Sequence, residues 1–207
     1  MLDVHAPEHR IGGLRDFMVH MLTITVGLLI AIGLEQSVEA MHHRHQRKEA
    51  EMLIREEIRA NQKGIQENAQ GLMTEINGMR DTLQALEAMS DGKPGKLNEK
   101  ELEFHEGPMR DSAWRTASTT GVLSYMDYSE VENFSEAYKE QDQLQGMEAM
   151  ALNDYLQLAP ILHGTGGVVD PARAKEALPY ARNAMGHLSG MYFIGRGTLD
   201  AYAGVLK

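Results

Sequence analysis

The chain has 207 residues, enough for one membrane anchor and one compact domain, and it contains no cysteine. The absence of cysteine excludes disulfides, thiolate metal sites and thiol nucleophiles, but it is compatible with either side of a membrane. A formal net charge of −10 disfavours nucleic acid and anionic lipid headgroups as partners.

The charge is unevenly distributed along the chain. Residues 41–100 carry ten Lys or Arg and ten Asp or Glu, whereas residues 101–158 carry three and twelve. We interpret the acidic stretch as the solvated surface of helices. Such a surface could also favour a basic protein partner over residues 101–158.

The first predicted element is an apolar run over residues 17–34, with one histidine and no formal charge. With a little of each flank, a helix of this length crosses a hydrocarbon core of about 30 Å. A signal peptide is the competing interpretation, because Val38 and Ala40 satisfy the small-residue rule for cleavage. Since the run is long for a signal peptide, we expect a retained transmembrane helix over residues 17–40, after an N-terminal tail of residues 1–16.

One face of this helix differs from the others. His20, Thr23, Gly27, Ala31 and Glu35 lie three or four apart, which places small and polar groups in one stripe. Small residues let another helix approach closely, and a polar group in lipid seeks a protein partner. We expect this partner-helix face to pack against other transmembrane helices. His20 is also a candidate ligand for a haem or chlorophyll, but a hydrogen bond to a neighbouring helix explains it better, and no cofactor is predicted.

A band of histidines and cations follows the apolar run. His42, His45 and Glu49 are candidate metal ligands, because His45 and Glu49 lie four apart. Glu39 with His42 also has the Glu-x-x-His spacing of di-iron bundles, but such a site needs a second pair and the sequence has no other. We therefore interpret the band as an anchor at the level of the lipid headgroups and predict no metal.

The helix is expected to continue beyond the membrane, since no Gly or Pro interrupts residues 35–57. Apolar residues then recur at steps of three or four, with Asn61 and Asn68 filling two gaps, as in a heptad seam with one inserted step. The helix should reach Met89, where residues 90–95 supply turn chemistry. The seam consists of Ile54, Ile58, Ile65, Leu72, Ile76, Met79, Leu83 and Leu86.

Shorter elements are predicted next. We expect a helical turn or two over residues 98–105. A helix that begins near Asp111 or Ser112 should follow and carry Trp114, Ala117, Val122 and Leu123. Trp114, the only tryptophan, is interpreted as a core anchor of the bundle. Further on, residues 164–167 (GTGG) precede a helix but lack the strand and the lysine of a phosphate loop, so we interpret them as a hinge.

Two long amphipathic helices complete the chain. Asp127 with Glu130 three residues later has the pattern of a capping box and should open the first, which stops around residues 160–167. Asp170 followed by Pro171 is typical of a helix start. From Leu178 to Leu206, apolar residues recur at regularly alternating steps of three and four.

The fold class follows from this pattern. No stretch alternates with period two for long enough to predict a strand. We predict an all-α protein in which an N-terminal transmembrane helix continues into a long helix of an antiparallel helical bundle. That bundle should occupy residues 41–207.

Several segments together resemble a known group of proteins. These are GLLIAIGLEQ at the end of the apolar run, AWRTASTTGVLSYM, and ENFSEAYKEQ. They are similar to a widespread family of bacterial single-pass membrane proteins that is a domain of unknown function. Its motif residues, which look structural, correspond to Trp114, Ala117, Gly121, Leu123 and Tyr138. The resemblance implies an inner-membrane protein with a helical extramembrane domain, and it implies no activity.

Two arguments about orientation conflict. Arg44, Arg47 and Lys48 follow the apolar run, whereas Arg10 and Arg15 precede it, so the positive-inside rule favours a cytoplasmic domain. The similar proteins tend to have a strongly basic N-terminus, which places their domain outside. We expect the bundle on the periplasmic side of the bacterial inner (cytoplasmic) membrane.

The predicted function is non-enzymatic, because no nucleophile elbow or acid–base pair can be identified. We expect a single-pass accessory or scaffold subunit that packs on and stabilises a larger membrane complex, for which a respiratory or photosynthetic complex would be a host. Its partners would be the lipid bilayer and other transmembrane helices. The alternative is a homodimeric membrane-anchored sensor, with the seam as a coiled coil and Asn61 and Asn68 setting its register.

Overall fold

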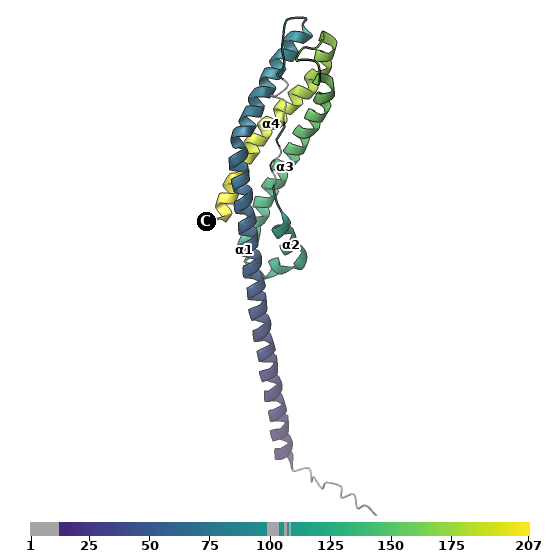
Figure 1. The fold of residues 1–207 in the computed structure, drawn as a ribbon. Helices are drawn as coiled ribbons and strands as arrows, with labels where there is room; N and C mark the ends of the chain where they lie inside the picture. Colours follow the sequence, from purple (N-terminus) through teal and green to yellow (C-terminus); the bar gives the residue numbers. More distant parts are fainter. Residues whose placement is uncertain (1–12, 99–103, 106, 108) are drawn as a thin grey trace, which may run out of the picture. The chain divides into compact units, whose positions relative to one another are not determined.

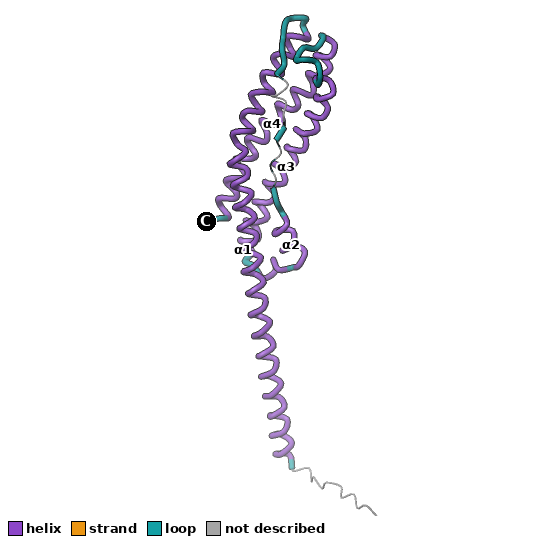
Figure 2. The backbone as a smooth tube through the Cα atoms, viewed as in Figure 1, coloured by secondary structure: helices purple, strands orange, loops and turns teal. Residues whose placement is uncertain are grey.

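A computed structural model describes residues 13–98, 104–105, 107 and 109–207, and all regular structure among them is helical (Figure 2). The all-α prediction is therefore confirmed. The helices are α1 (Leu14–Ser90), α2 (Ser112–Thr120), the 3₁₀-helix η2 (Val122–Tyr125), α3 (Tyr128–Leu162) and α4 (Pro171–Val205).

The chain divides into two compact units, residues 1–48 and residues 49–207, and the boundary falls within α1. The described part of the first unit is the N-terminal part of α1 after Gly13. The second unit holds the rest of α1 and all the other helices. As predicted, α1 ends at the turn that follows Met89, and its interior glycines do not interrupt it.

Within the second unit, three long helices lie side by side (Figure 1). Gln141 of α3 contacts Tyr202 near the end of α4, whereas Asp154 contacts His187, so α3 and α4 are antiparallel. Arg182 of α4 donates to Glu87 near the end of α1, at 3.1 Å. α4 is therefore antiparallel to α1 as well, and this places α1 and α3 in the same direction.

In the sequence, an extended segment follows α1 and precedes α2 and α3. The helices α1 and α3 run in the same direction, so the chain has to return between them. We call the described residues of this segment, 104–105, 107 and 109–111, together with the first two residues of α2 (112–113), the strap. The strap runs back along α1, because His105 contacts Glu75 whereas Ala113 contacts Glu57. The helical turns predicted over residues 98–105 fall largely on residues 99–103, outside the described residues; Asn98, Phe104 and His105 are not helical.

Both predicted helix starts are confirmed, because α3 begins after Asp127 and α4 after Asp170, but only one of the two predicted caps forms. The Asp170 side chain accepts hydrogen bonds from the backbone N–H groups of Ala172 (2.9 Å) and Arg173 (3.0 Å), as expected. The capping box at residue 127 was wrong. The Asp127 side chain makes no capping hydrogen bond, and the Glu130 carboxylate binds the Arg55 guanidinium of α1 at 3.1 Å.

Helix α2 is shorter than its amphipathic sequence suggests. Gly121 adopts a left-handed conformation, with φ of 76°, which ends the helix after Thr120. Val122 and Leu123, which the sequence placed in the same helix, lie in η2 instead. Val122 still reaches the core.

Two apolar clusters form the core, and both lie wholly within the second unit. One surrounds Ile54, Phe134 and Tyr202, near the start of the part of α1 that belongs to the second unit, the beginning of α3 and the end of α4. The other surrounds Met79, Leu158 and Leu188 further along the bundle. The first unit contributes no side chain to either cluster among the described residues.

Candidate functional site

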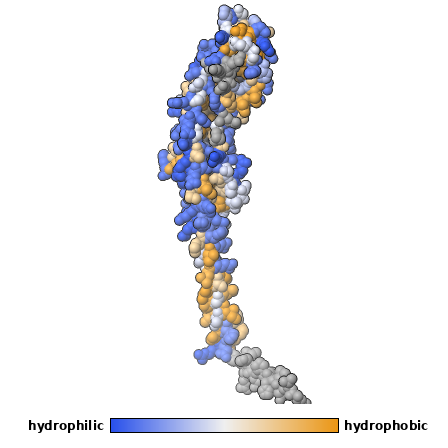
Figure 3. All heavy atoms as spheres, viewed as in Figure 1, coloured by the Kyte–Doolittle hydropathy of each residue, from blue (hydrophilic) through white to orange (hydrophobic). Residues whose placement is uncertain are grey.

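Apolar side chains along the N-terminal part of α1 are exposed, and Figure 3 shows apolar surface on the face in view. Phe17 is 56% exposed and Leu29 63%, and residues 13–42 are all classed as exposed. By length and composition, α1 contains a segment apolar enough to cross a membrane, and none of that segment is buried. So large an exposed apolar surface marks a site of interaction.

The five residues of the predicted partner-helix face all lie on this exposed helix. α1 is continuous through them, so their spacing keeps them in one stripe. The Thr23 hydroxyl donates to the Val19 carbonyl at 2.9 Å, and a Cβ placed on Gly27 would meet nothing within 4 Å. Thr23 therefore contributes its small size to the stripe, because its hydrogen bond is made inside its own helix.

The histidine band makes its contacts through a residue that the sequence analysis did not select. His43 contacts the Glu39 carboxylate at 3.4 Å and the Gln46 amide oxygen at 3.5 Å. His42 and His45 are exposed residues of the first unit, whereas Glu49 belongs to the second. Among the described residues, no group of three or more His, Asp or Glu side chains is arranged to hold a metal ion.

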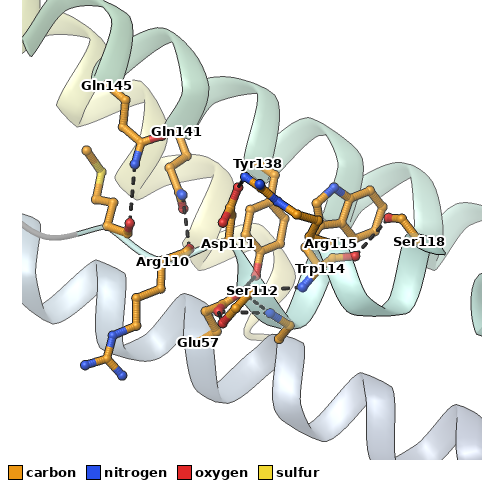
Figure 4. Close-up of polar contacts among 12 residues, drawn as sticks. Glu57, Arg110, Asp111, Ser112, Trp114, Arg115, Ser118, Tyr138, Gln141 and Gln145 are labelled. Carbon is orange, nitrogen blue, oxygen red and sulfur yellow. Dashed lines mark hydrogen bonds and ion pairs between the residues drawn. The ribbon is translucent and has the colours of Figure 1, made fainter. Parts of the chain in front are cut away.

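In the second unit, buried side chains of α1 and α3 bind the strap. Glu57 is 8% exposed and accepts hydrogen bonds from the Ser112 hydroxyl (2.7 Å), the Ala113 backbone N–H (3.0 Å) and the Tyr138 hydroxyl (2.7 Å) (Figure 4). Asp111 makes no capping hydrogen bond at the start of α2. A carboxylate from another helix therefore satisfies the N-terminal donors of α2.

An amide layer follows one turn along α1. The Asn61 side chain exchanges two hydrogen bonds with the backbone of Arg110, donating to its carbonyl and accepting from its N–H. The Gln141 amide also donates to the Arg110 carbonyl (Figure 4), and its oxygen accepts from Asn61 and from the Tyr202 hydroxyl. These amides are buried and bonded to one another, so they fix the strap in one register.

Two more carboxylates hold the next part of the strap. Glu75 accepts from the His105 backbone N–H at 3.0 Å and contacts the His105 ring nitrogen Nδ1 at 2.9 Å. Glu148 accepts from the Gly107 backbone N–H at 2.9 Å. Burial raises the pKa of the Glu75 carboxyl, and the contacts with His105 lower it by less.

This arrangement of polar groups is suited to holding backbone. Burial, and then the hydrogen bond to Glu57, raise the pKa of the Tyr138 hydroxyl, so Tyr138 remains a proton donor at neutral pH. Trp114 is half-buried and stacks on the Tyr138 ring, with centroids 5.4 Å apart. Trp114 thus lies at the edge of the core and covers the hydrogen bonds of Glu57.

The acidic stretch over residues 101–158 is only partly a solvated surface. Glu148 and Asp154 are 7% and 5% exposed, and Asp154 contacts the His187 ring nitrogen at 2.7 Å. Glu130 binds Arg55, and Asp111 binds Arg115. Several of its carboxylates therefore serve internal contacts and are not available to a partner.

Sequence reasoning found one member of the strap-binding set and missed the others. Asn61 was identified as a polar layer, but Glu57 and Glu75 were not selected. Each of these glutamates directly precedes a seam isoleucine, Ile58 or Ile76, and so lies beside the apolar face of α1. A carboxylate next to a buried seam was the available signal.

Comparison with known proteins gives no relative. No protein-family model matches the chain, and no curated protein or solved structure matches it.

Proposed function

We propose that the protein is a non-enzymatic, single-pass membrane accessory or scaffold subunit that packs on a larger membrane complex. The observation that carries this proposal is the uncovered apolar surface of α1 over residues 17–34. Transfer of each large side chain of this kind out of water is worth about 1.5–3 kcal/mol. A lipid bilayer, together with neighbouring helices, would supply that environment.

The second unit supports separate roles for the apolar helix as an anchor and for the bundle as a scaffold. Both apolar clusters are built from residues after Lys48, so the fold of the bundle does not depend on burying residues 17–34. The buried side chains of Glu57, Asn61 and Gln141 are engaged in hydrogen bonds that hold the strap. These features favour a scaffold over an enzyme.

The stripe of His20, Thr23, Gly27, Ala31 and Glu35 is the proposed contact with other transmembrane helices. Packing at small residues supplies the attraction between helices in lipid, where the hydrophobic effect does not. A respiratory or photosynthetic complex of the bacterial inner membrane would be a suitable host, with the bundle on the periplasmic side. The resemblance of the sequence to single-pass inner-membrane proteins supports this location.

The alternative, a sensor that dimerises through the seam of α1, has less support. Ile54, Ile58 and Met79 of that seam are fully buried inside the second unit of a single chain. Asn61 binds the strap, and Asn68 is exposed. A coiled coil between two copies would have to remove these seam residues from the bundle.

The test compares two substitutions on adjacent residues of the apolar helix. Gly27→Leu adds four carbons to the stripe, whereas Leu28→Ala removes three carbons from the neighbouring face. We expect Gly27→Leu to release co-purifying membrane proteins after mild detergent extraction and native separation, while the protein stays inserted, since leucine favours both helix and insertion. Leu28→Ala should have little effect.

Two outcomes would contradict the proposal. If the wild-type chain migrates alone or as a dimer, at the mass of 23.1 kDa or its double plus detergent, then no larger complex exists. If the partner survives Gly27→Leu but is lost with Leu28→Ala, then the contact face has been assigned wrongly.

A further inference from the structure

A groove of about 390 Å³ opens in the second unit between α1, the strap and α4. Its walls come from α1 between Gly64 and Glu75, from strap residues such as Met109, and from α4 between Met191 and Leu199. All of its lining residues lie within residues 49–207. The groove is therefore independent of the proposed role of the membrane helix.

The sequence of α1 explains why the groove exists. Asn68 occupies a seam position, and Gly64 and Gly71 lie beside the seam, directly before Ile65 and Leu72; a Cβ placed on either glycine would meet nothing within 4 Å. Asn68 and Gly71 are exposed, whereas Asn61 before them and Ile76 after them are buried. The bundle thus closes before and after this segment but leaves it open.

The walls of the groove are mostly apolar. Ile65, Leu72 and Leu144 contribute from α1 and α3, and Met191 and Leu199 contribute from α4. A volume of a few hundred Å³ with such walls and a few polar groups is typical of small-molecule sites. An apolar ligand body would be the natural occupant of this space.

The polar groups of the groove are predominantly anionic. Glu75 and Glu148 line it and are 5% and 7% exposed, and Glu67 adds a third carboxylate. Arg196 is the opposing cation among the lining residues, and His105 adds a positive charge only when it is protonated. Glu67 pairs with Lys63 at 3.5 Å, so the two buried carboxylates, Glu75 and Glu148, give the groove its anionic character and favour a cationic ligand.

The buried environment of the Glu75 carboxylate also favours a cationic ligand. Burial raises its pKa by more than the His105 contacts lower it, so the charged form is incompletely compensated. Among the described residues, the backbone and the ring of His105 both bind the Oε1 atom of Glu75. An ammonium group beside this carboxylate would supply the missing compensation.

We propose that the groove binds a small organic cation, an amine with an apolar body, whose ammonium group lies beside Glu75 and Glu148. The apolar body lies against Leu72, Leu144 and Met191. A ligand such as 2-phenylethylammonium has both parts at a size suited to the space.

The test uses the full chain in phosphatidylcholine nanodiscs, with empty nanodiscs as the blank for partition into lipid. The probes are 2-phenylethylammonium and its neutral analogue 2-phenylethanol, titrated by calorimetry. We expect saturable binding of the amine below about 10 mM. The alcohol should bind about tenfold more weakly or worse, because it cannot pair with a buried carboxylate.

Three variants assign the site. Glu75→Gln should weaken amine binding about tenfold or more and leave the alcohol unaffected, whereas Glu56→Gln, on the exposed side of the same helix, should change neither. Gly71→Leu should remove binding of both probes by filling the groove, while improving the helix propensity of α1. Glu148→Gln serves as the second carboxylate variant if circular dichroism shows that Glu75→Gln is unfolded.

The proposal is overturned by any of three results. These are no saturable binding of the amine, equal affinity for the amine and the alcohol, or full binding by the Gly71→Leu variant.

Discussion

Glu57 of α1 joins three helices through one carboxylate. Its donors are Ser112 and Ala113 at the start of α2, and Tyr138 on α3. Glu57 is only 8% exposed, so its carboxylate makes these contacts in a buried position. A carboxylate buried at this level is tolerated because its oxygens accept several hydrogen bonds, including those from the N-terminus of a helix.

The loss of Glu57 should therefore be costly. We expect Glu57→Ala to lower the free energy of unfolding by about 3–5 kcal/mol, because it leaves several buried donors without an acceptor. Denaturant unfolding followed by circular dichroism would measure the change. Glu56→Ala is the matched control, since Glu56 is the exposed neighbour and should change stability by less than about 0.5 kcal/mol.

An equal effect of the two alanine variants would show that the Glu57 hydrogen bonds contribute no net stability. Glu57→Gln should fall between them, because its amide keeps one acceptor oxygen but places an N–H₂ group where donors converge.

At the scale of the element, α4 shows how small residues set helix packing. Ala174, Ala177, Ala181 and Ala184 are all fully buried, at 0% exposure, and they form a line along one face of the helix. The apolar period from Leu178 to Leu206 predicts only part of this buried face. It selects the large apolar residues, whereas the observed face also contains the alanines. Met185, Tyr192 and Leu199 are only half-buried. The small side chains allow α4 to approach its neighbours closely.

Enlarging one of these alanines should strain the bundle. We expect Ala184→Leu to destabilise the protein by about 1–3 kcal/mol, because a well-packed core has no space for three more carbons. Ala203→Leu, at an exposed position of the same helix, should be nearly neutral. Thermal unfolding of the two variants compares them directly, and a neutral Ala184→Leu would mean that α4 packs more loosely than described.

The elements differ in how well the sequence predicts them. The end of α1, the Asp170 cap and the apolar faces of α3 and α4 follow from local signals that act within a turn or two of the chain. The capping box at Asp127 failed because Glu130 binds Arg55, a partner 75 residues away. The strap was not predicted, because its backbone is satisfied by Glu57, Asn61 and Gln141, which lie far away in the sequence.

The same contrast applies to the candidate sites. The apolar run and its stripe are properties of one continuous helix, so the sequence alone defines their positions. The groove with Glu75 and Glu148 brings together α1, the strap, α3 and α4, and no single segment carries its pattern. A gap in the seam around Asn68 was visible, but the sequence did not show that it faces a groove instead of a second helix.

At the scale of the whole molecule, the two units present different surfaces to their surroundings. The second unit covers its own core, with residues such as Ile58 and Leu86 fully buried, whereas residues 17–34 of the first unit are uncovered. Every member of both apolar clusters comes from residues 50–206. The buried hydrogen bonds of Glu57, Asn61 and Gln141 are likewise made within this range.

We therefore expect a fragment of residues 49–207 to fold without the first unit. It should be soluble without detergent, helical by circular dichroism, and cooperative in thermal unfolding, since small domains with a complete core usually unfold in one step. The full chain should require detergent or lipid, because its exposed apolar helix would associate in water. An aggregated fragment, or one that melts without a transition, would show that residues 1–48 help to form the bundle. That result would also weaken the separation of an anchor from a scaffold on which the proposed function depends.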